Sequence, residues 1–194
     1  MALAYWLRPD YAITVNYGQV AAPSEIRAAS AFCDWMKIAH EVVNVNCREL
    51  GCGEMAGVPE HALSPKKEWW PYRNQFLVTV AAMKLIHLNV HEICLGTVKG
   101  DDVFADGRED FVHALDRLLG MQEGSIRISA PAMHLTSPEL VLESKIPIGL
   151  LALAHSCHQG VVPCGECRGC IKNQEVFAFL EELTSTAENG CCSL

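Results

Sequence analysis

The stretch YAITVNYGQVAAPSEIRAASAFCDWMKIAHEVVNVNC, residues 11–47, decides the fold class. It opens on a β-branched run that ends at Gly18, continues after Ser24 with apolar residues at helical spacing, and closes on a second β-branched run. We expect the Ser24 hydroxyl to cap the helix by accepting a free backbone N–H group of its first turn. The stretch therefore predicts a strand, a helix and a second strand in that order.

The same alternation continues on both sides of this stretch. The expected elements are a helix at 1–7, a loop rich in glycine and proline at 48–71, helices at 74–89 and 109–120, and strands at 92–98 and 126–133. Strands this apolar cannot face water on one side, so we expect a parallel sheet with helices on both faces. The predicted fold class is α/β, with a Rossmann-like parallel sheet and one domain over residues 1–194.

The composition is that of a globular protein, with 194 residues, 50% of them hydrophobic and 20% charged. A formal net charge of −8 argues against binding to a nucleic-acid backbone, which needs concentrated lysine and arginine. No run approaches the ~18 apolar residues of a membrane span, and the opening MALAYWLRPDY lacks the features of a signal peptide. We therefore predict a cytoplasmic protein whose partner is a small molecule or another protein.

The segment HSCHQGVVPCGECRGC, residues 155–170, contains four cysteines at metal-ligand spacing. They follow the pattern C-x6-C-x2-C-x2-C and are Cys157, Cys164, Cys167 and Cys170. Two-residue gaps let thiolates converge on one ion, and the longer gap lets the chain loop back to complete a tetrahedron. Four ligands with no open position predict a structural zinc site. An iron–sulfur cluster and four unligated thiols are the alternatives that stay open.

The other cysteines and the two neighbouring histidines are predicted to be bystanders. Cytosolic thiols are kept reduced, so the ten cysteines are not expected to form disulfides. His155 and His158 are expected to be neighbours of the metal and not ligands. Three cysteines stand among apolar residues and are predicted to be small buried side chains: Cys33, Cys47 and Cys94. Cys191 and Cys192 lie in a polar tail and are predicted to have no role.

Four segments together resemble the 7-cyano-7-deazaguanine synthase (QueC) family of the PP-loop ATP pyrophosphatase superfamily. They are WPYRN at 70–74, GTVKGDDVFADGREDF at 96–111, APAMHLTSPEL at 130–140 and the cysteine segment. The resemblance runs in order over most of the chain. It implies a sheet of the PP-loop (HUP) type with a zinc-binding C-terminal segment at 155–194. It also implies homodimers and a role in queuosine biosynthesis.

The resemblance implies an ATP-dependent ligase that works with Mg²⁺. The carboxylate of a 7-carboxy-7-deazaguanine becomes an acyl-adenylate, and ammonia then converts it into an amide or a nitrile. A carboxylate resists amines because it is anionic and has a poor leaving group, and adenylation removes both obstacles. Such a site positions reactants and stabilises charge, and it needs no side-chain nucleophile. The absence of a G-x-S-x-G motif agrees with this chemistry.

The resemblance also implies site residues. The nucleotide-binding set is Tyr17, Gly18, Gln19, Arg73, Asn74, Gly96 and Thr136. Asp106 and Arg108 match the family's substrate loop, where an acid accepts from a guanine-like edge and an arginine meets a carboxylate. From the residues alone, an ordinary turn, a helix cap and a solvated charge cluster stay open at these places. Thr136, Ser137 and Glu139 predict a capping box ahead of a helix.

Two features depart from the family pattern. In the family, an SGGxDS turn stands before the first helix, and its backbone N–H groups hold the ATP pyrophosphate. The helix expected at 1–7 matches that first helix, so the first strand and this turn are expected to be missing. We expect the natural start to lie upstream. Ser137 stands where the family commonly has lysine. These departures leave open a catalytically inactive PP-loop homologue that acts as a binding or scaffold partner in a defence or modification complex.

The segments GTVKGDD and AHSCHQG are similar to those of QueC-like proteins found with antiviral defence systems. This finer resemblance implies a protein amine as an alternative to ammonia as the acceptor.

Overall fold

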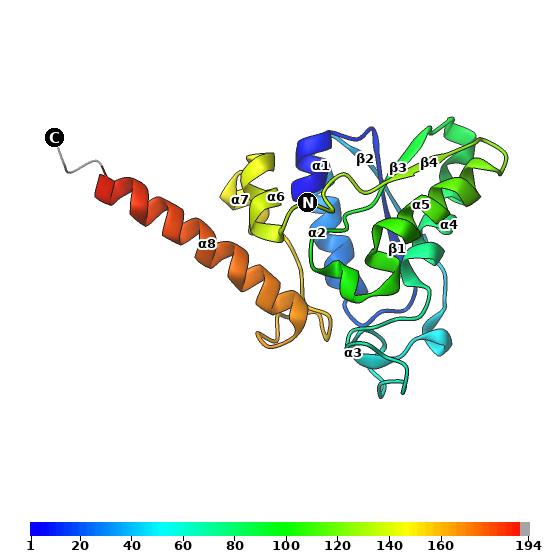
Figure 1. Cartoon of the computed structure of the whole chain (residues 1–194), viewed down its shortest axis with the longest axis horizontal. Helices are drawn as coiled ribbons and strands as arrows, with labels where there is room; N and C mark the ends of the chain where they lie inside the picture. Colours follow the sequence, from blue (N-terminus) through cyan, green and yellow to red (C-terminus); the bar gives the residue numbers. More distant parts are fainter. Residues whose placement is uncertain (191–194) are drawn as a thin grey trace.

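The computed structural model of the protein describes residues 1–190, and within them the side chains of residues 1–185 (Figure 1). The strands are β1 (Tyr11–Asn16), β2 (Ala39–Asn44), β3 (Glu92–Cys94) and β4 (Arg127–Ser129). The helices are α1 (Ala2–Leu7), α2 (Ala22–Met36), α3 (Gly53–Ala56), α4 (Arg73–Leu85), α5 (Glu109–Gly120), α6 (Ser137–Ser144), α7 (Ile148–Leu151) and α8 (Arg168–Gly190). Short 3-10 turns lie at Arg48–Leu50, Ile86–Leu88, Asp101–Val103 and Ala105–Gly107. Cys191 and Cys192 lie outside the described residues.

The strands pair in parallel, as the alternation of strands and helices predicts. β1 lies beside β2, with Tyr11 opposite Ala39, and β3 lies beside β4, with Glu92 opposite Arg127. Within residues 1–190 these pairs form two separate two-stranded sheets. The α/β class and the parallel pairing are therefore confirmed, whereas the hydrogen-bonded sheet is divided in two.

The β3–β4 pair is shorter than the sequence predicts, with three residues in each strand. The Leu95 N–H still donates to the Ser129 carbonyl at 2.7 Å, which extends the pairing by one hydrogen bond. Pro131 follows soon after and has no N–H group to donate, so the ladder ends there.

One face of β3 is open to solvent, which corrects the expectation that helices cover both faces of every strand. Ile93 is half-buried against the apolar residues of α4 and α5, while Glu92 and Cys94 on the other face are exposed. Alternate residues of a strand point to opposite faces, so Cys94 cannot share the burial of Ile93. The prediction that Cys94 is buried is wrong; Cys33 is buried as predicted, and Cys47 is half-buried.

Helix α2 begins before the residue expected to cap it. The helix starts at Ala22, with Pro23 in its first turn, so Ser24 lies inside the helix. The Ser24 hydroxyl donates to the Val161 carbonyl at 2.8 Å and accepts from Arg27. The predicted capping role of Ser24 is wrong because proline favours the first turn of a helix and moves the start upstream. Ser24 instead joins α2 to the loop that contains the cysteine segment.

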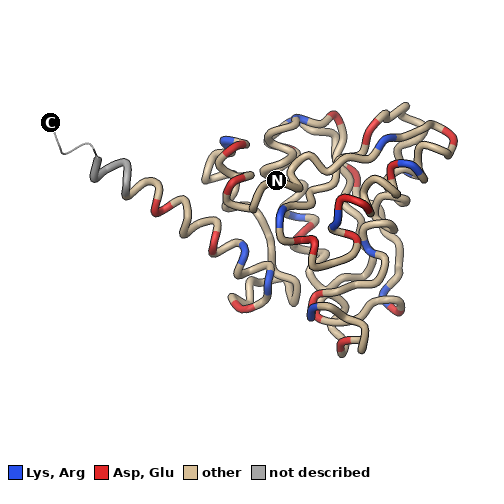
Figure 2. The backbone as a smooth tube through the Cα atoms, viewed as in Figure 1, with Lys and Arg blue, Asp and Glu red and all other residues tan. Residues whose placement is uncertain are grey.

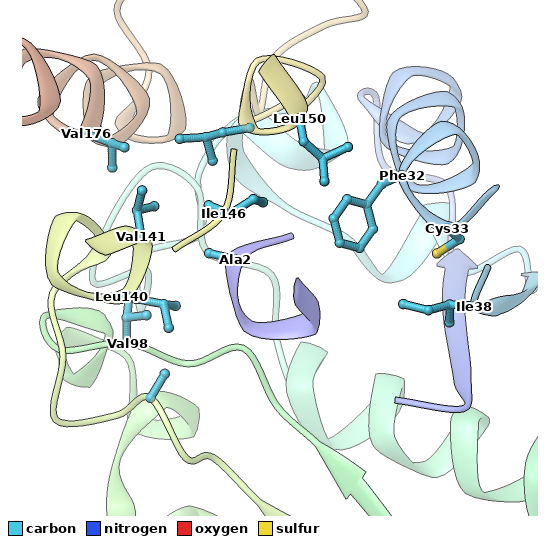
Figure 3. Packing of buried hydrophobic residues seen from close by; sticks show 12 residues of the cluster. Ala2, Phe32, Cys33, Ile38, Val98, Leu140, Val141, Ile146, Leu150 and Val176 are labelled. Atoms are coloured by element: carbon cyan, nitrogen blue, oxygen red, sulfur yellow. The ribbon is translucent and has the colours of Figure 1, made fainter. Parts of the chain in front are cut away.

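The largest apolar cluster joins the N-terminal helices to the C-terminal ones (Figure 3). Ala2 of α1 and Phe32 of α2 pack with Leu140 of α6, Leu150 of α7 and Val176 of α8. These residues are separated by up to 174 positions in the chain, so the cluster fixes α6–α8 against the first helices. The rest of α8 projects away from the body (Figure 1).

Two further apolar clusters support the strand pairs. Val78 of α4 packs with Leu115 of α5 and Ile128 of β4, and Val15 of β1 packs with Trp70 before α4. The accessible surface of the chain is 11369 Å², against about 9,100 Å² for a compact protein of this mass. The excess agrees with the projecting helix. In the described part of the chain, no helix is long and apolar enough to cross a membrane.

Candidate functional site

A charged pocket of about 910 Å³ lies between α6, the start of α8 and two loops. This volume is within the range of about 300–1,000 Å³ that is typical of small-molecule sites. Its positive side chains are Lys66, Lys67, Lys99, Arg168 and Lys172, and its negative ones are Glu54, Glu68, Glu166 and Glu175. Acidic and basic positions are interspersed in this part of the chain (Figure 2). The pocket therefore suits a polar ligand better than an apolar one.

Three of the lysines in the pocket are available to a ligand. Arg168 forms salt bridges with Glu68 and Asp101, and Lys172 forms one with Asp101. Within the described residues the other lysines of the pocket form no salt bridge: Lys66, Lys67 and Lys99. An ammonium group without a carboxylate partner can donate charge-assisted hydrogen bonds to a phosphate or a carboxylate.

Helix α6 begins at the wall of this pocket, where Thr136 and Ser137 line it. Thr136 is the N-cap, its side chain accepts from the Glu139 N–H, and Glu139 accepts from the Thr136 N–H at 2.7 Å. The predicted capping box is confirmed. The hydrogen bond from the Thr136 N–H also lowers the pKa of Glu139. The polar groups of this helix start are thus satisfied by its own side chains.

The turn at residues 17–19 is built from buried and internally hydrogen-bonded groups. The ring of Tyr17 meets Trp70 edge to face, with 4.7 Å between centroids. The Gln19 side chain accepts from the Tyr17 N–H at 2.9 Å and donates to Glu25 at 2.8 Å. Gly18 has φ +101°, and a Cβ there would lie 2.9 Å from Arg48. The Gln19 amide therefore shapes the turn, and the turn needs glycine at its centre.

The start of α4 brings four of the predicted site residues together. The Asn74 N–H donates to Asp106 Oδ2 at 3.2 Å, and its side-chain amide donates to the Asp106 carbonyl at 3.2 Å. Arg73 lies beside Tyr17, and burial raises the pKa of that phenol to about 12 despite the opposing charge of Arg73. Asp106 thus supplies a cap for α4, and the predicted nucleotide residues adjoin the predicted substrate loop.

Of the predicted nucleotide- and substrate-binding residues, Thr136 alone lines this pocket. The others lie outside its lining: Tyr17, Gly18, Gln19, Arg73, Asn74, Gly96, Asp106 and Arg108. Arg108 is exposed, and its Nε donates to the Asp102 carbonyl at 3.1 Å. Gly96, after β3, is exposed with open space around it. In this structure neither residue is placed where it meets a ligand in the pocket.

The four cysteines of residues 157–170 meet at one point. All four Sγ atoms lie within 4.8 Å of one another, with 3.9 Å between Cys164 and Cys170 and 4.0 Å between Cys157 and Cys167. Zinc–sulfur bonds of about 2.3 Å in a tetrahedron place the sulfurs about 3.8 Å apart. An iron–sulfur cluster distributes its four cysteines over two or four irons, and this spreads the sulfurs further apart. The cysteines therefore fit a single tetrahedral metal ion such as zinc.

The backbone around the cysteines prepares them to be thiolates. The Cys167 N–H donates to Cys164 Sγ at 3.3 Å, and the Cys170 N–H donates to Cys167 Sγ at 3.4 Å. Hydrogen bonds from backbone N–H groups, with that of Glu166 having the largest effect, lower the pKa of Cys164 to about 7. Burial raises the pKa of Cys170 to about 12. A cation at the centre would stabilise the charged form of the buried thiols.

Glycine is required inside the cysteine segment. A Cβ at Gly169 would collide with the Ser156 carbonyl oxygen and come within 2.9 Å of His158. The close approach lets the segment fold back on itself so that Cys157 meets Cys167 and Cys170. His158 Nδ1 is buried without a hydrogen-bond partner in the described residues, and burial lowers its pKa.

Sequence reasoning did not find the charged residues that line the pocket. Lys66, Lys67 and Glu68 fall in the loop predicted at 48–71, and Arg168 falls between two of the predicted cysteine ligands. The one signal in the sequence was the pair of lysines next to a glutamate.

The fold and the site define a class: a mixed α/β protein with parallel strand pairs, a charged pocket and a four-cysteine site for one metal ion. The family model described as "Queuosine biosynthesis protein QueC" matches residues 5–181. The chain belongs to this family.

Curated relatives agree over nearly the whole chain. A 7-cyano-7-deazaguanine synthase of Gloeobacter violaceus is 33% identical, covering 86% of this chain and 80% of the relative. The protein of that name from Methanocaldococcus jannaschii is 28% identical, covering 91% of this chain and 88% of the relative. The one from Methanosarcina barkeri is 28% identical, covering 87% and 82%.

Proposed function

We propose that this protein is an ATP-dependent carbon–nitrogen ligase that acts on the carboxylate of a 7-carboxy-7-deazaguanine. The observation that supports it best is the family match over residues 5–181, which includes the pocket walls and the cysteine segment. The similar curated proteins are named 7-cyano-7-deazaguanine synthase. A nitrile made from a carboxylate requires activation of a poor leaving group, and this requirement explains the need for ATP.

The reaction consists of two activations. The substrate carboxylate attacks the α-phosphorus of ATP and pyrophosphate leaves; ammonia then attacks the acyl carbon, AMP leaves with the C–O electron pair, and a proton goes to solvent. The resulting amide oxygen attacks the α-phosphorus of a second ATP and pyrophosphate leaves; AMP then leaves with the C–O electron pair, and both N–H protons go to solvent, which gives the nitrile. A protein amine in place of ammonia would stop the sequence at an amide.

We assign the positive side chains of the pocket to the anions of this reaction. Lys66, Lys67 and Lys99 have no salt bridge in the described residues, so they can meet phosphate or carboxylate oxygens. Ser137 adds a hydroxyl group to the same pocket, whereas the Thr136 hydroxyl is engaged in the capping box with Glu139. Mg²⁺ would accompany ATP as part of the substrate. The four cysteines would hold zinc for structure.

The remaining site residues of the family resemblance are proposals of the same kind. Arg73 and Asn74 would face the nucleotide and Asp106 the base; these three adjoin one another at the start of α4, outside the lining of the pocket. Arg108 donates to Asp102, so contact with substrate would need a different arrangement of its exposed side chain.

The test is an assay with ATP, Mg²⁺, ammonium and 7-carboxy-7-deazaguanine. We expect AMP and pyrophosphate, and a product lighter than the acid by the mass change of an amide or a nitrile. Lys99→Ala should lower kcat/KM by more than tenfold, because the variant lacks the ammonium group that we assign to the charge of the reacting anions. Lys84→Ala, which removes an exposed lysine paired with Glu41, is the matched control and should keep full activity. Protein that releases no AMP with any nitrogen donor would contradict the proposal.

A further inference from the structure

One arginine in the cysteine segment joins three parts of the chain. Arg168 Nη1 donates to Glu68 at 3.1 Å, and Nη2 donates to the Gly100 carbonyl at 2.8 Å and to Asp101 at 3.4 Å. Its guanidinium also lies over the ring of Phe104, 5.3 Å from the centroid. The partners are 64 to 100 residues away in the sequence. Of these residues, Arg168, Glu68 and Gly100 line the pocket.

We propose that Arg168 is a positioning residue through which the four-cysteine metal site holds the loop at residues 98–108 in place. The metal then orders one wall of the pocket and has a role in ligand binding as well as in folding. Only the link to substrate binding rests on the proposed function.

The backbone of Arg168 is fixed by two of the cysteines. The residue lies between Cys167 and Cys170, and the Cys170 N–H donates to Cys167 Sγ at 3.4 Å across it. The next residue, Gly169, is pressed against the Ser156 carbonyl. A metal ion that holds both thiolates therefore determines where the Arg168 side chain starts. Loss of the ion would free the whole turn that presents the guanidinium.

The loop receives this constraint through Asp101. One oxygen of its carboxylate accepts from Lys172 at 2.9 Å and from Arg168, and the other accepts from the Val98 N–H at 3.1 Å. A Cβ at Gly107 would collide with the Asp101 carbonyl, so the two 3-10 turns of the loop lie in direct contact. A displacement of Asp101 would therefore move the second turn.

The second turn in the loop contains Asp106, whose carboxylate and carbonyl accept from Asn74 at the start of α4. The contacts form a continuous path from the cysteines through Arg168 and Asp101 to Asp106. Lys99, on the same loop, faces the pocket. The path thus connects the metal site to the residues that we expect to meet the ligand.

Glu68 needs a separate control because its side chain is only 7% exposed. Removal of Arg168 would leave a buried carboxylate without its partner, which destabilises a protein by itself. The experiment therefore uses the zinc-loaded full chain as wild type, Arg168→Ala, Glu68→Gln, and the double variant Arg168→Ala/Glu68→Gln. Arg127→Ala, which breaks an exposed ion pair with Asp116 on α5, is the distant control.

The measurement is amide hydrogen exchange, resolved by peptide. Phe104 N–H donates to the Asp101 carbonyl and Gly107 N–H to the Phe104 carbonyl, both at 3.0 Å, so these amides report on the loop. In Arg168→Ala and in the double variant we expect exchange at 98–108 to be at least tenfold faster, with zinc content and the exchange of α5 unchanged. Glu68→Gln and Arg127→Ala should change exchange in the loop less than twofold. Arg168→Lys should rescue protection only in part, because one ammonium cannot make the forked contacts.

Chelation gives the decisive comparison, because two perturbations on one path are not additive. Zinc removal should accelerate exchange of the loop in wild type but add less than twofold in Arg168→Ala. The proposal is overturned if the loop stays protected in Arg168→Ala, if chelation acts equally in both proteins, or if α5 loses protection as well.

Substrate binding is measured on the same proteins by titration with 7-carboxy-7-deazaguanine. We expect binding at least tenfold weaker in Arg168→Ala than in wild type or Glu68→Gln. If wild type does not bind this compound, the proposed function fails while the exchange result still decides the role of Arg168.

Discussion

The α5–β4 region and the cysteine segment are held together by different forces. The first packs Val112, Leu115 and Ile128 against α4 and has an apolar core of its own. In the second, the buried cluster of the described residues consists of Cys157, Cys167 and Cys170. Hydrophobic burial stabilises the first region directly, whereas the second gathers thiols that a bound cation would stabilise. The two regions should therefore respond differently to the same treatments.

The largest effect should follow loss of a metal ligand. Cys167→Ser should reduce bound zinc from one equivalent to almost none and unfold residues 155–170, because ligand binding and folding of such a site are coupled and are worth about 10 kcal/mol or more. Metal analysis and hydrogen exchange provide the measurement. Cys94→Ser, at an exposed cysteine on β3, should keep its zinc. Iron with sulfide in the purified protein, or a full complement of zinc in Cys167→Ser, would show that the site is something else.

The apolar region should show the converse behaviour. Leu115 is 3% exposed within the α4–α5–β4 cluster, so Leu115→Ala should lower the free energy of unfolding by about 2–5 kcal/mol, with or without zinc. Leu118 on the same helix is 46% exposed, and Leu118→Ala should cost less than about 1 kcal/mol. Urea unfolding followed by circular dichroism measures both. Equal losses in the two variants would mean that α5 does not bury the face described here.

The two regions also differ in how much the sequence predicts. Helix α5 occupies the expected residues 109–120 because its apolar residues recur at helical spacing within one segment. The cysteine cluster was predicted for the same reason, since ligand spacing is local. The pocket was not, because Lys66, Lys99 and Arg168 come from three segments that only the tertiary fold brings together. No local pattern marks such a site.

Local rules failed where a distant contact or a neighbouring residue decided the outcome. Ser24 has the type of a helix cap, yet Pro23 moves the helix start and Val161 takes the hydroxyl. Cys94 stands in an apolar run, yet it lies on the open face of β3. Homodimers, a protein amine acceptor, the cytoplasmic location and a defence role stay predictions.

Acid should weaken the α5–β4 region before it affects its apolar core. Asp116 accepts two hydrogen bonds from Arg127 at 2.8 Å and one from the Ile128 N–H. These hydrogen bonds, of which those from Arg127 have the largest effect, lower the pKa of Asp116 to about 2. A carboxylate with a lowered folded-state pKa contributes stability above its unfolded pKa of about 3.9 and loses it as the pH falls toward 2.

The size of this contribution should be on the order of 1 kcal/mol, because the partner Arg127 is largely exposed. The unfolding free energy of wild type and Asp116→Asn should therefore differ at pH 6 and converge near pH 2. A difference that persists unchanged at pH 2 would mean that the charge of Asp116 is not the cause.

The smallest effect should come from a helix end beside the cysteine segment. Lys145 ends α6 with φ 55°, in the left-handed region that costs a side chain about 1 kcal/mol, and its N–H donates to the Leu142 carbonyl. Lys145→Gly removes that cost and should raise the free energy of unfolding by about 0.5–1 kcal/mol. Glu143→Gly, at an exposed helical position of α6, should lower it by about 1 kcal/mol.

Thermal unfolding with and without a chelator measures these changes and tests whether a more stable end of α6 can compensate for loss of the metal. Because a bound ion, and not the helix propensity of α6, would hold the cysteine segment together, Lys145→Gly should leave the zinc affinity of residues 157–170 unchanged. A tighter site in this variant would mean that α6 and the metal stabilise one cooperative unit.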